Sequence, residues 1–271
     1  MVAALILASF PRPSSNAIHL GPFQVRAYGL AIAIGVVVAV WFAQRRWAAR
    51  GGDPGDISAH AVWAVPAGLL GARLYHVITD WQRFQGRWTH VLFIWEGGLG
   101  IPGGLIAGVA AGAWAARRRG LTVGPLLDVV APAIPIAQAI GRLGNWFNQE
   151  LFGRPTDLPW ALRIDAEHRP DRYADMATFH PTFLYEALWN VALAMLLVWL
   201  GNRARLRTGT LFALYVAGYA LGRLWVESLR SDPASLVLGV RVNILVSGIA
   251  FAIAAAITVV RERSARPVVM T

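Results

Sequence analysis

The chain has 271 residues, of which 56% are hydrophobic and 15% charged, with a formal net charge of +10. Soluble domains carry about 25% charged residues, so this composition is typical of a membrane protein. There is no cysteine, and all 25 basic residues are arginine, which excludes disulfides, metal thiolates, a thiol nucleophile and lysine chemistry. The arginines separate apolar segments and form no single patch, so they indicate membrane topology and no nucleic-acid partner.

Apolar stretches of the length needed to cross a bilayer, about 20 residues, occur seven times along the chain. The predicted spans are 23–43, 57–78, 93–116, 125–146, 181–200, 209–229 and 242–260. We therefore predict an all-α polytopic membrane protein with seven transmembrane helices, forming one domain over residues 1–271. Residues 1–10 are apolar but short and stop at Pro11, so we expect an interfacial arm and not a cleaved signal peptide.

Arginine clusters follow the first, third, fifth and seventh predicted spans. They are Arg45, Arg46 and Arg50; Arg117, Arg118 and Arg119; Arg203, Arg205 and Arg207; and Arg261, Arg263 and Arg266. With seven spans all four clusters fall on one side, which the positive-inside rule makes cytoplasmic. The N-terminus is then outside and the C-terminus inside. The longest opposite loop, 147–180, has mixed charge, and we predict a small external, periplasmic-side domain between spans four and five.

Glycine is unusually frequent in the third predicted span. It recurs at every fourth position, at Gly100, Gly104, Gly108 and Gly112. This spacing predicts a smooth helix face that lets a neighbouring helix approach closely. A second group, Gly97, Gly98 and Gly103 with Pro102, can instead loosen the helix beside a site and expose backbone groups, and the two interpretations are compatible.

Ionisable residues within spans are costly and suggest function. They are Arg26, Arg73, Glu96, Asp128, Arg142, Glu186, Arg223 and Glu227. For Asp128, near the cytoplasmic end, a side chain that reaches water is a sufficient explanation. Arg73 can either pair with Glu96 or contact a substrate.

Two arginines point to a phosphate site. Arg223 and Glu227 lie four residues apart and share a helix face, which Arg230 continues. They can form an ion pair that only locks helices together, or the glutamate can hold the arginine toward an anion. Arg142 lies at a similar depth, and two guanidinium groups can each bind phosphate oxygens through paired hydrogen bonds. Near it, Asn145, Asn148 and Glu150 can order the loop or bind a lipid headgroup.

The segment GRLGNWFNQELFGRPT closely resembles the signature of bacterial prolipoprotein diacylglyceryl transferases. Further similar blocks occur in the same order as in that family, and together they cover nearly the whole chain. They are HLGPFQVRAYGL, GARLYHV, WEGGLGIPGG, HPTFLYEA and YALGRLWVESLRSD. The resemblance implies transfer of the diacylglyceryl group of phosphatidylglycerol to the lipobox cysteine of a lipoprotein precursor, with formation of a thioether and release of glycerol phosphate.

The resemblance also implies the site. Arg142 matches the family's phosphatidylglycerol-binding arginine, and Arg223 its second essential arginine. The other matching functional or near-functional positions are Tyr28, Asn145, Glu150, Gly153, His180, Tyr219, Glu227 and Arg230. The implied partners are phosphatidylglycerol, prolipoprotein signal peptides with a lipobox cysteine, and membrane lipids. The implied location is the bacterial cytoplasmic membrane, with the active site toward the outer leaflet, and no metal or cofactor is required.

One position departs from the family pattern. Many members carry a histidine, proposed as the catalytic base, where this chain has Pro102 in IPGG. The remaining proton acceptors are His180, Glu150, Glu227 and the lipid phosphate, and His180 can equally be structural because it precedes Pro181 at a helix start. The rival functions are a transporter, a different membrane transferase and a purely structural membrane protein. The charges cluster toward one side and not at the membrane midplane, which disfavours a transporter.

Overall fold

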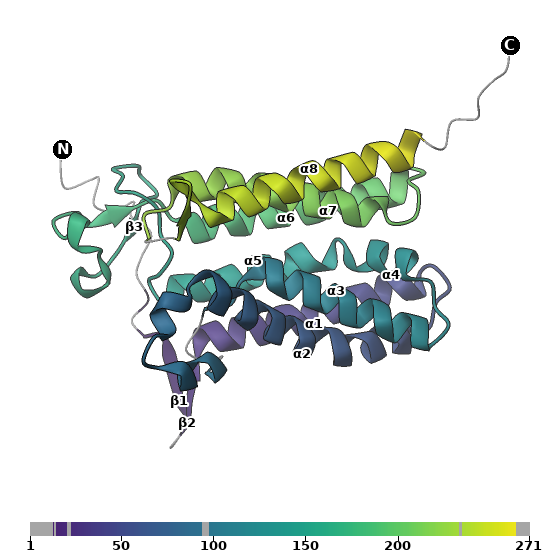
Figure 1. Ribbon diagram of the computed structural model, residues 1–271, viewed down its shortest axis with the longest axis horizontal. Helices are drawn as coiled ribbons and strands as arrows, with labels where there is room; N and C mark the ends of the chain where they lie inside the picture. The colour runs from purple at the N-terminus through teal and green to yellow at the C-terminus, as the bar shows by residue number, and fades with distance from the viewer. Residues whose placement is uncertain (1–12, 14, 21–22, 94–97, 233–234, 264–271) are drawn as a thin grey trace, which may run out of the picture.

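The structure, a computed structural model, describes residues 13, 15–20, 23–93, 98–232 and 235–263 (Figure 1). The α-helices are α1 (Ala27–Ala48), α2 (Pro54–Thr79), α3 (Ile101–Arg118), α4 (Val123–Val130), α5 (Ala133–Phe147), α6 (Thr182–Arg203), α7 (Thr210–Leu229) and α8 (Val242–Arg263). Three antiparallel two-stranded sheets join β1 (Ala17–Leu20) with β2 (Phe23–Arg26), β3 (Leu162–Arg163) with β4 (Thr178–Phe179), and β5 (Leu236–Val237) with β6 (Val240–Arg241).

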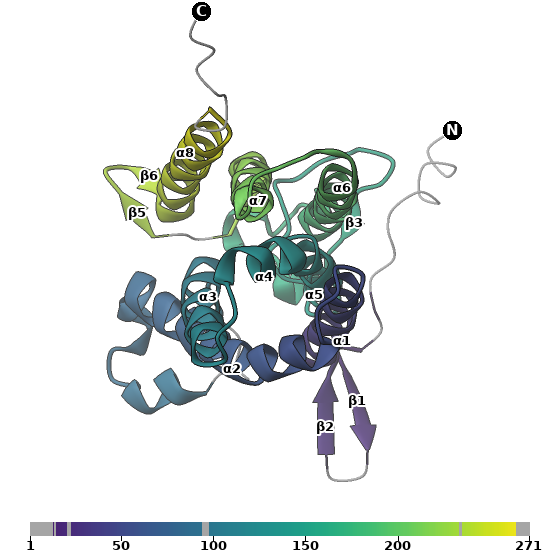
Figure 2. The same cartoon turned by 90° about the vertical axis from the view of Figure 1, so that its right-hand side faces the viewer.

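The long helices run side by side in two groups. In both views α6, α7 and α8 lie together above α1, α2, α3 and α5, and α4 lies where the two groups meet (Figures 1 and 2). Many large apolar side chains point outward, including Val37, Leu70 and Ile106, which are 67%, 67% and 71% exposed. An exposed apolar surface of this kind suits contact with lipid.

Among the residues that the structure describes, five helical segments are long and apolar enough to cross a membrane: α1, α2, α4 with α5, α6 and α8. This confirms a mostly helical membrane protein. Helices α3 and α7 occupy the third and sixth predicted spans but do not meet the same criterion. Helix α3 is rich in glycine, and α7 carries Arg223 and Glu227, which lowers their hydropathy. The count of seven spans stays a prediction.

The fourth predicted span is confirmed as one apolar segment over Val123–Phe147, although it has an internal break, and two other predicted span starts were wrong. The fourth span is two helices, α4 and α5, interrupted at Ala131 and Pro132, because proline lacks a backbone N–H and its ring clashes with the preceding turn. The third span, expected from residue 93, becomes helical only at Ile101, with Pro102 in its first turn. The first begins at Ala27, because residues 23–26 form β2.

Close packing of α2 on α3 confirms the predicted role of the glycine face. A Cβ atom on Gly104 would lie 3.1 Å from the carbonyl oxygen of Gly68, and one on Gly103 would lie 2.3 Å from that of Gly71. Gly103 therefore also serves the packing of the two helices, while Gly97 lies outside the described residues.

Residues 147–180, which we call the head, gather beyond one end of the helices (Figure 1). The head has a small hydrophobic cluster, formed by Phe152, Leu162, Ile164 and Phe179 together with Phe183 of α6. The side chain of Gln149 bonds both the carboxylate and the backbone N–H of Asp165, at 2.8 and 2.9 Å. These contacts make the head a folded unit joined to the start of α6, and its place outside the membrane stays a prediction.

Described members of the arginine clusters gather at the opposite end. Gly201 of α6 packs beside Arg46 of α1, and Gly209 beside Arg261 of α8. Asp128 of α4 is part of this end, but its predicted role was wrong. Its carboxylate accepts hydrogen bonds from the backbone N–H groups of Gly209 at 2.6 Å and Phe212 at 3.1 Å. It therefore caps the N-terminus of α7, where the helix leaves such groups without partners.

Candidate functional site

A continuous series of alternating charges lies at the end of the helices that meets the head. We call it the ion-pair chain. Its members, in order of contact, are Arg142, Glu186, Arg223, Glu227, Arg241, Asp232 and Arg230. They come from the last turns of α5 and α7, the beginning of α6, the segment after α7 and the residue before α8. Five segments of the sequence therefore converge on one site.

Glu186 joins the two arginines predicted to bind phosphate. Its Oε2 lies 2.5 Å from Nη2 of Arg142, and its Oε1 lies 3.3 Å from Nη1 of Arg223. All three side chains are nearly buried, with exposed fractions of 7%, 11% and 12% for Glu186, Arg142 and Arg223. The two guanidinium groups repel each other, and the Glu186 carboxylate between them offsets this repulsion.

Glu227 is the second carboxylate of the ion-pair chain, and its side chain is completely buried. Its Oε2 lies 2.5 Å from Nη2 of Arg223, four residues before it, as the sequence predicted. Its Oε1 accepts hydrogen bonds from Nε of Arg241 at 2.6 Å and from Nδ2 of Asn243 at 3.4 Å. Glu227 thus links α7 to the beginning of α8.

Asp232 ends the series between two arginines. Its Oδ1 lies 2.7 Å from Nε of Arg230, and its Oδ2 lies 3.3 Å from Nη2 of Arg241. Burial would raise the pKa of Asp232, but the hydrogen bond from Arg230 and the charges of Arg230 and Arg241 outweigh it and hold the pKa below its ordinary value. The carboxylate is therefore ionised at neutral pH.

The ion-pair chain has one more positive than negative group, because four arginines face three carboxylates. Glu150 lies beside Arg142, linked to it through Asn145, and is a fourth carboxylate at this end of the site. Each guanidinium has five N–H donors, so Arg142 and Arg223 keep donors beyond those that face the carboxylates.

A group of amides lies beside Arg142. Asn145, 3% exposed, accepts from Nη1 of Arg142 at 3.4 Å and donates to Oε1 of Glu150 at 3.0 Å. Asn148 donates to the same oxygen, also at 3.0 Å. These bonds show that the group orders the turn between α5 and the head, which was one of its two predicted roles. Contact with a lipid headgroup stays a prediction.

Both predicted tyrosines lie at the same place. Tyr28 of α1 packs against Gly144, where an added Cβ would come within 2.6 Å of its ring, and it lies in electrostatic range of Arg142 and Glu150. Tyr219 of α7 lies in electrostatic range of Arg142 and Arg223. The structure therefore brings eight of the ten predicted site residues together. They are Tyr28, Arg142, Asn145, Glu150, Tyr219, Arg223, Glu227 and Arg230.

Gly153 and His180, the other two, lie in the backbone contact between the head and α7. Gly153 donates its N–H to the His180 carbonyl at 2.9 Å and pairs with Arg230 in an isolated bridge. A Cβ there would lie 2.7 Å from Cβ of His180 and 3.0 Å from the Leu229 carbonyl oxygen. Glycine is needed for this close approach, which places the backbone of Arg230. Direct substrate binding by Gly153 or His180 stays a prediction.

The His180 ring is held by its neighbours. Its Nδ1 lies 3.2 Å from the Tyr185 hydroxyl, which also accepts from the Trp160 indole at 2.9 Å. Burial lowers the pKa of His180 from its ordinary value, and the positive charge of Arg154 lowers it further. The imidazole is therefore neutral at pH 7.

A pH dependence of stability follows from this lowered pKa. As the pH falls through the ordinary histidine value of about 6.5, the unfolded chain binds a proton that the folded His180 resists, so the free energy of unfolding decreases. Above that pH His180 is neutral in both the folded and the unfolded chain, so this destabilising contribution disappears. We expect His180→Gln to flatten the decline in thermal stability between about pH 7 and pH 5, measured on the detergent-solubilised protein. An unchanged slope would contradict the prediction.

Three members of the ion-pair chain were not predicted as site residues: Glu186, Asp232 and Arg241. Glu186 was noted only as a charge within a span. Arg241 had a usable signal, because it directly precedes an apolar stretch at the end where the arginine clusters do not lie. Asp232 also had a signal, because it ends the block YALGRLWVESLRSD that carries the family resemblance.

Arg73 has a structural role. Its Nε and Nη2 donate to the carbonyl oxygens of Val91 and His90, at 2.9 and 2.5 Å, and its guanidinium lies over the Phe84 ring. It therefore organises the segment between α2 and α3. Its alternative partner, Glu96, lies outside the described residues.

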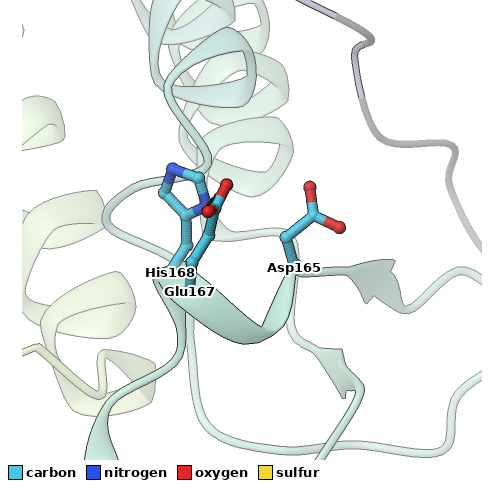
Figure 3. A group of neighbouring side chains, drawn as sticks. All are labelled: Asp165, Glu167 and His168. Atoms are coloured by element: carbon cyan, nitrogen blue, oxygen red, sulfur yellow. Dashed lines mark ion pairs between the residues drawn. The ribbon is translucent and has the colours of Figure 1, made fainter.

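A separate acidic group lies on the head, where Glu167 and His168 lie close together with Asp165 beside them (Figure 3). Their possible ligand atoms lie within 4.8 Å of one another. Asp165 is already bonded to Gln149, and the Glu167 side chain is 79% exposed. Exposed groups of this kind are common on protein surfaces and do not by themselves indicate a metal site.

Comparison with known proteins gives one consistent result. The family described as "Prolipoprotein diacylglyceryl transferase" matches residues 15–260. A phosphatidylglycerol–prolipoprotein diacylglyceryl transferase of Streptomyces griseus is 53% identical over 95% of this chain and 79% of its own length. Proteins of the same name from Rhodococcus jostii and Cutibacterium acnes are each 50% identical, over 91% and 94% of this chain and 73% and 87% of their own lengths.

Proposed function

This chain belongs to the prolipoprotein diacylglyceryl transferase family, and from that premise we propose how its ion-pair chain carries out the transfer. The protein is a multi-pass bacterial membrane transferase that moves the diacylglyceryl group of phosphatidylglycerol to the cysteine of a prolipoprotein. The proposal concerns the residues that bind the lipid, the acceptor segment, and the side of the membrane on which transfer takes place.

The contact of Glu186 with both Arg142 and Arg223 is the observation that supports the proposal best. We place the lipid phosphate against these two guanidinium groups, which keep N–H donors that do not face the carboxylates. Charge-assisted hydrogen bonds from arginine to phosphate are strong and directional. They strengthen as the phosphate gains charge in the transition state, which is the condition for catalysis by electrostatic stabilisation.

In the proposed reaction the sulfur of a lipobox cysteine attacks the carbon of the diacylglyceryl group that is bonded to the phosphate oxygen. The carbon–sulfur bond forms as the carbon–oxygen bond breaks, and glycerol phosphate leaves with the bonding electrons on its oxygen. Arg142 and Arg223 stabilise that charge. They also favour the thiolate, because nearby cations lower the pKa of a cysteine thiol.

The thiol proton needs an acceptor, and the three candidate side chains are already engaged. Glu227 has a carboxylate oxygen on each of two arginines. Glu150 accepts two amide bonds, and His180 is bonded to Tyr185. Pro102 has no proton-accepting side chain. We therefore assign the proton to the departing phosphate, which becomes basic as the carbon–oxygen bond breaks, because its second pKa is about 6, and which takes the thiol proton while the carbon–sulfur bond forms.

We propose seven membrane-spanning helices, with α3 and α7 as the additional spans. The N-terminus is then outside, the C-terminus is cytoplasmic, the head is periplasmic and the site faces the outer leaflet. The support comes from the separation of charges: described members of the arginine clusters lie at one end, and the ion-pair chain and head at the other.

A reconstituted transfer assay tests the function. Purified protein is mixed with phosphatidylglycerol and a peptide that carries a single lipobox cysteine, and the peptide is weighed by mass spectrometry. We expect the mass of one diacylglyceryl group to be added to the peptide and free glycerol phosphate to appear in equal amount. Serine in place of the peptide's cysteine, or phosphatidylethanolamine in place of the lipid, should abolish the reaction. Absence of transfer by folded wild-type protein would overturn the proposal.

A further inference from the structure

We propose that Arg241 is a positioning residue of this transferase, which neutralises Glu227 so that the charge of Arg223 stays available to the lipid phosphate. The inference rests on the function proposed above and adds a residue outside the motifs that carry the family resemblance. Arg241 lies in β6, directly before α8, whereas Arg223 and Glu227 lie in α7.

Each nitrogen of the Arg241 guanidinium has its own acceptor. Nε donates to Oε1 of Glu227 at 2.6 Å, Nη1 to the backbone carbonyl of Asp232 at 3.1 Å, and Nη2 to Oδ2 of Asp232 at 3.3 Å. One side chain therefore ties together the end of α7, the segment after it and the beginning of α8. A planar group with fixed donor directions can make these three contacts at once, and a lysine cannot.

The charge of Glu227 explains why this position matters for Arg223. Glu227 is completely buried, so its charge must be balanced by neighbouring groups. Arg223 faces one of its oxygens and Arg241 the other. Without Arg241 the main positive partner left to Glu227 is Arg223. The two charges would then cancel, and Arg223 would be drawn toward Glu227 and away from Glu186 and the phosphate.

Arg241 is separated from Arg223, a residue of the proposed phosphate site, by the carboxylate of Glu227. Together with Asp232 it lines a cavity of about 460 Å³, which residues 170–172 of the head also line. Arg241 therefore contacts the buried Glu227 and also lines this cavity. Its acceptors are all protein groups, so we assign it no contact with the reacting atoms.

A double-mutant cycle in the transfer assay tests the inference. We expect Arg241→Gln to lower kcat/KM about tenfold or more, with a raised KM for phosphatidylglycerol, because the phosphate loses attraction to Arg223. In a Glu227→Gln background the same substitution should cost less than about threefold, since no charge is left to neutralise. Arg241→Lys should recover part of the loss.

Arg172→Gln is the matched control. Arg172 lines the same cavity but donates to the carbonyl of Ser231 and belongs to no ion pair of the ion-pair chain. We expect its KM for phosphatidylglycerol to stay at the wild-type value. Thermal unfolding midpoints are measured for all variants, and if Arg241→Gln does not fold, the cycle is run with Arg241→Lys, for which a smaller rise in KM is expected.

The two proposals fail in different ways. Wild-type protein that transfers nothing overturns the proposed function. Wild-type protein that transfers normally, with equal losses from the Arg241 substitution in both backgrounds or with an unchanged KM for phosphatidylglycerol, overturns the role of Arg241 and leaves the function standing.

Discussion

Alanine in place of Arg142 is expected to lower diacylglyceryl transfer by about 100-fold or more, the loss typical when one group that stabilises a developing oxyanion is removed. Arg142 is 11% exposed and contacts Glu186 and Asn145, which fix its direction. Removal of the Arg142 side chain leaves Glu186 paired with Arg223. The ion-pair chain then lacks its first member, but its other contacts remain. The loss should therefore appear in activity more than in stability.

The comparison of variants in the transfer assay makes this prediction specific. Arg142→Lys keeps the charge but loses the planar pair of donors, so we expect an intermediate loss. Arg163→Ala removes an exposed arginine of β3 in the head, far along the sequence from the ion-pair chain, and should transfer at the wild-type rate. An Arg142→Ala protein that keeps transfer within about threefold of wild type would place the phosphate elsewhere.

The second large effect concerns stability and the residue Glu186. Substitution by leucine is expected to cost about 3–5 kcal/mol of unfolding free energy, the range found when one partner of a buried charge pair is removed. Two nearly buried arginines would be left close together with no carboxylate between them. Thermal or denaturant unfolding in detergent measures the loss.

The matched control for Glu186 is Glu167→Leu on the head. The Glu167 side chain is 79% exposed, so its substitution should change the free energy of unfolding little.

A test with an anionic lipid links the stability of this site to its function. Phosphatidylglycerol that binds the folded state should raise the midpoint of Glu186→Gln by more than that of wild type, because the phosphate replaces the missing negative charge. A Glu186→Leu protein as stable as wild type would mean that the arginines are not held by this carboxylate.

Much of this site was predictable because its signals are local in sequence. Arg223 and Glu227 are four residues apart, and Arg142 and Asn145 three apart, and helical geometry brings such residues together. Motif resemblance added the amide turn and the two tyrosines. The helical ranges followed from long apolar runs, although Pro132 divided one of them where hydropathy predicted a continuous span.

Tertiary structure alone decided how these local pieces combine. Glu186 joins α5 to α7, Arg241 joins α8 to Glu227, and Asp128 of α4 caps α7. In each case the two partners lie on different helices or strands, and at least 14 residues of sequence separate them. A periodic pattern shows which face of a helix carries a charge, but it does not show which neighbour that face meets. The position of every carboxylate between its arginines depends on how the helices pack.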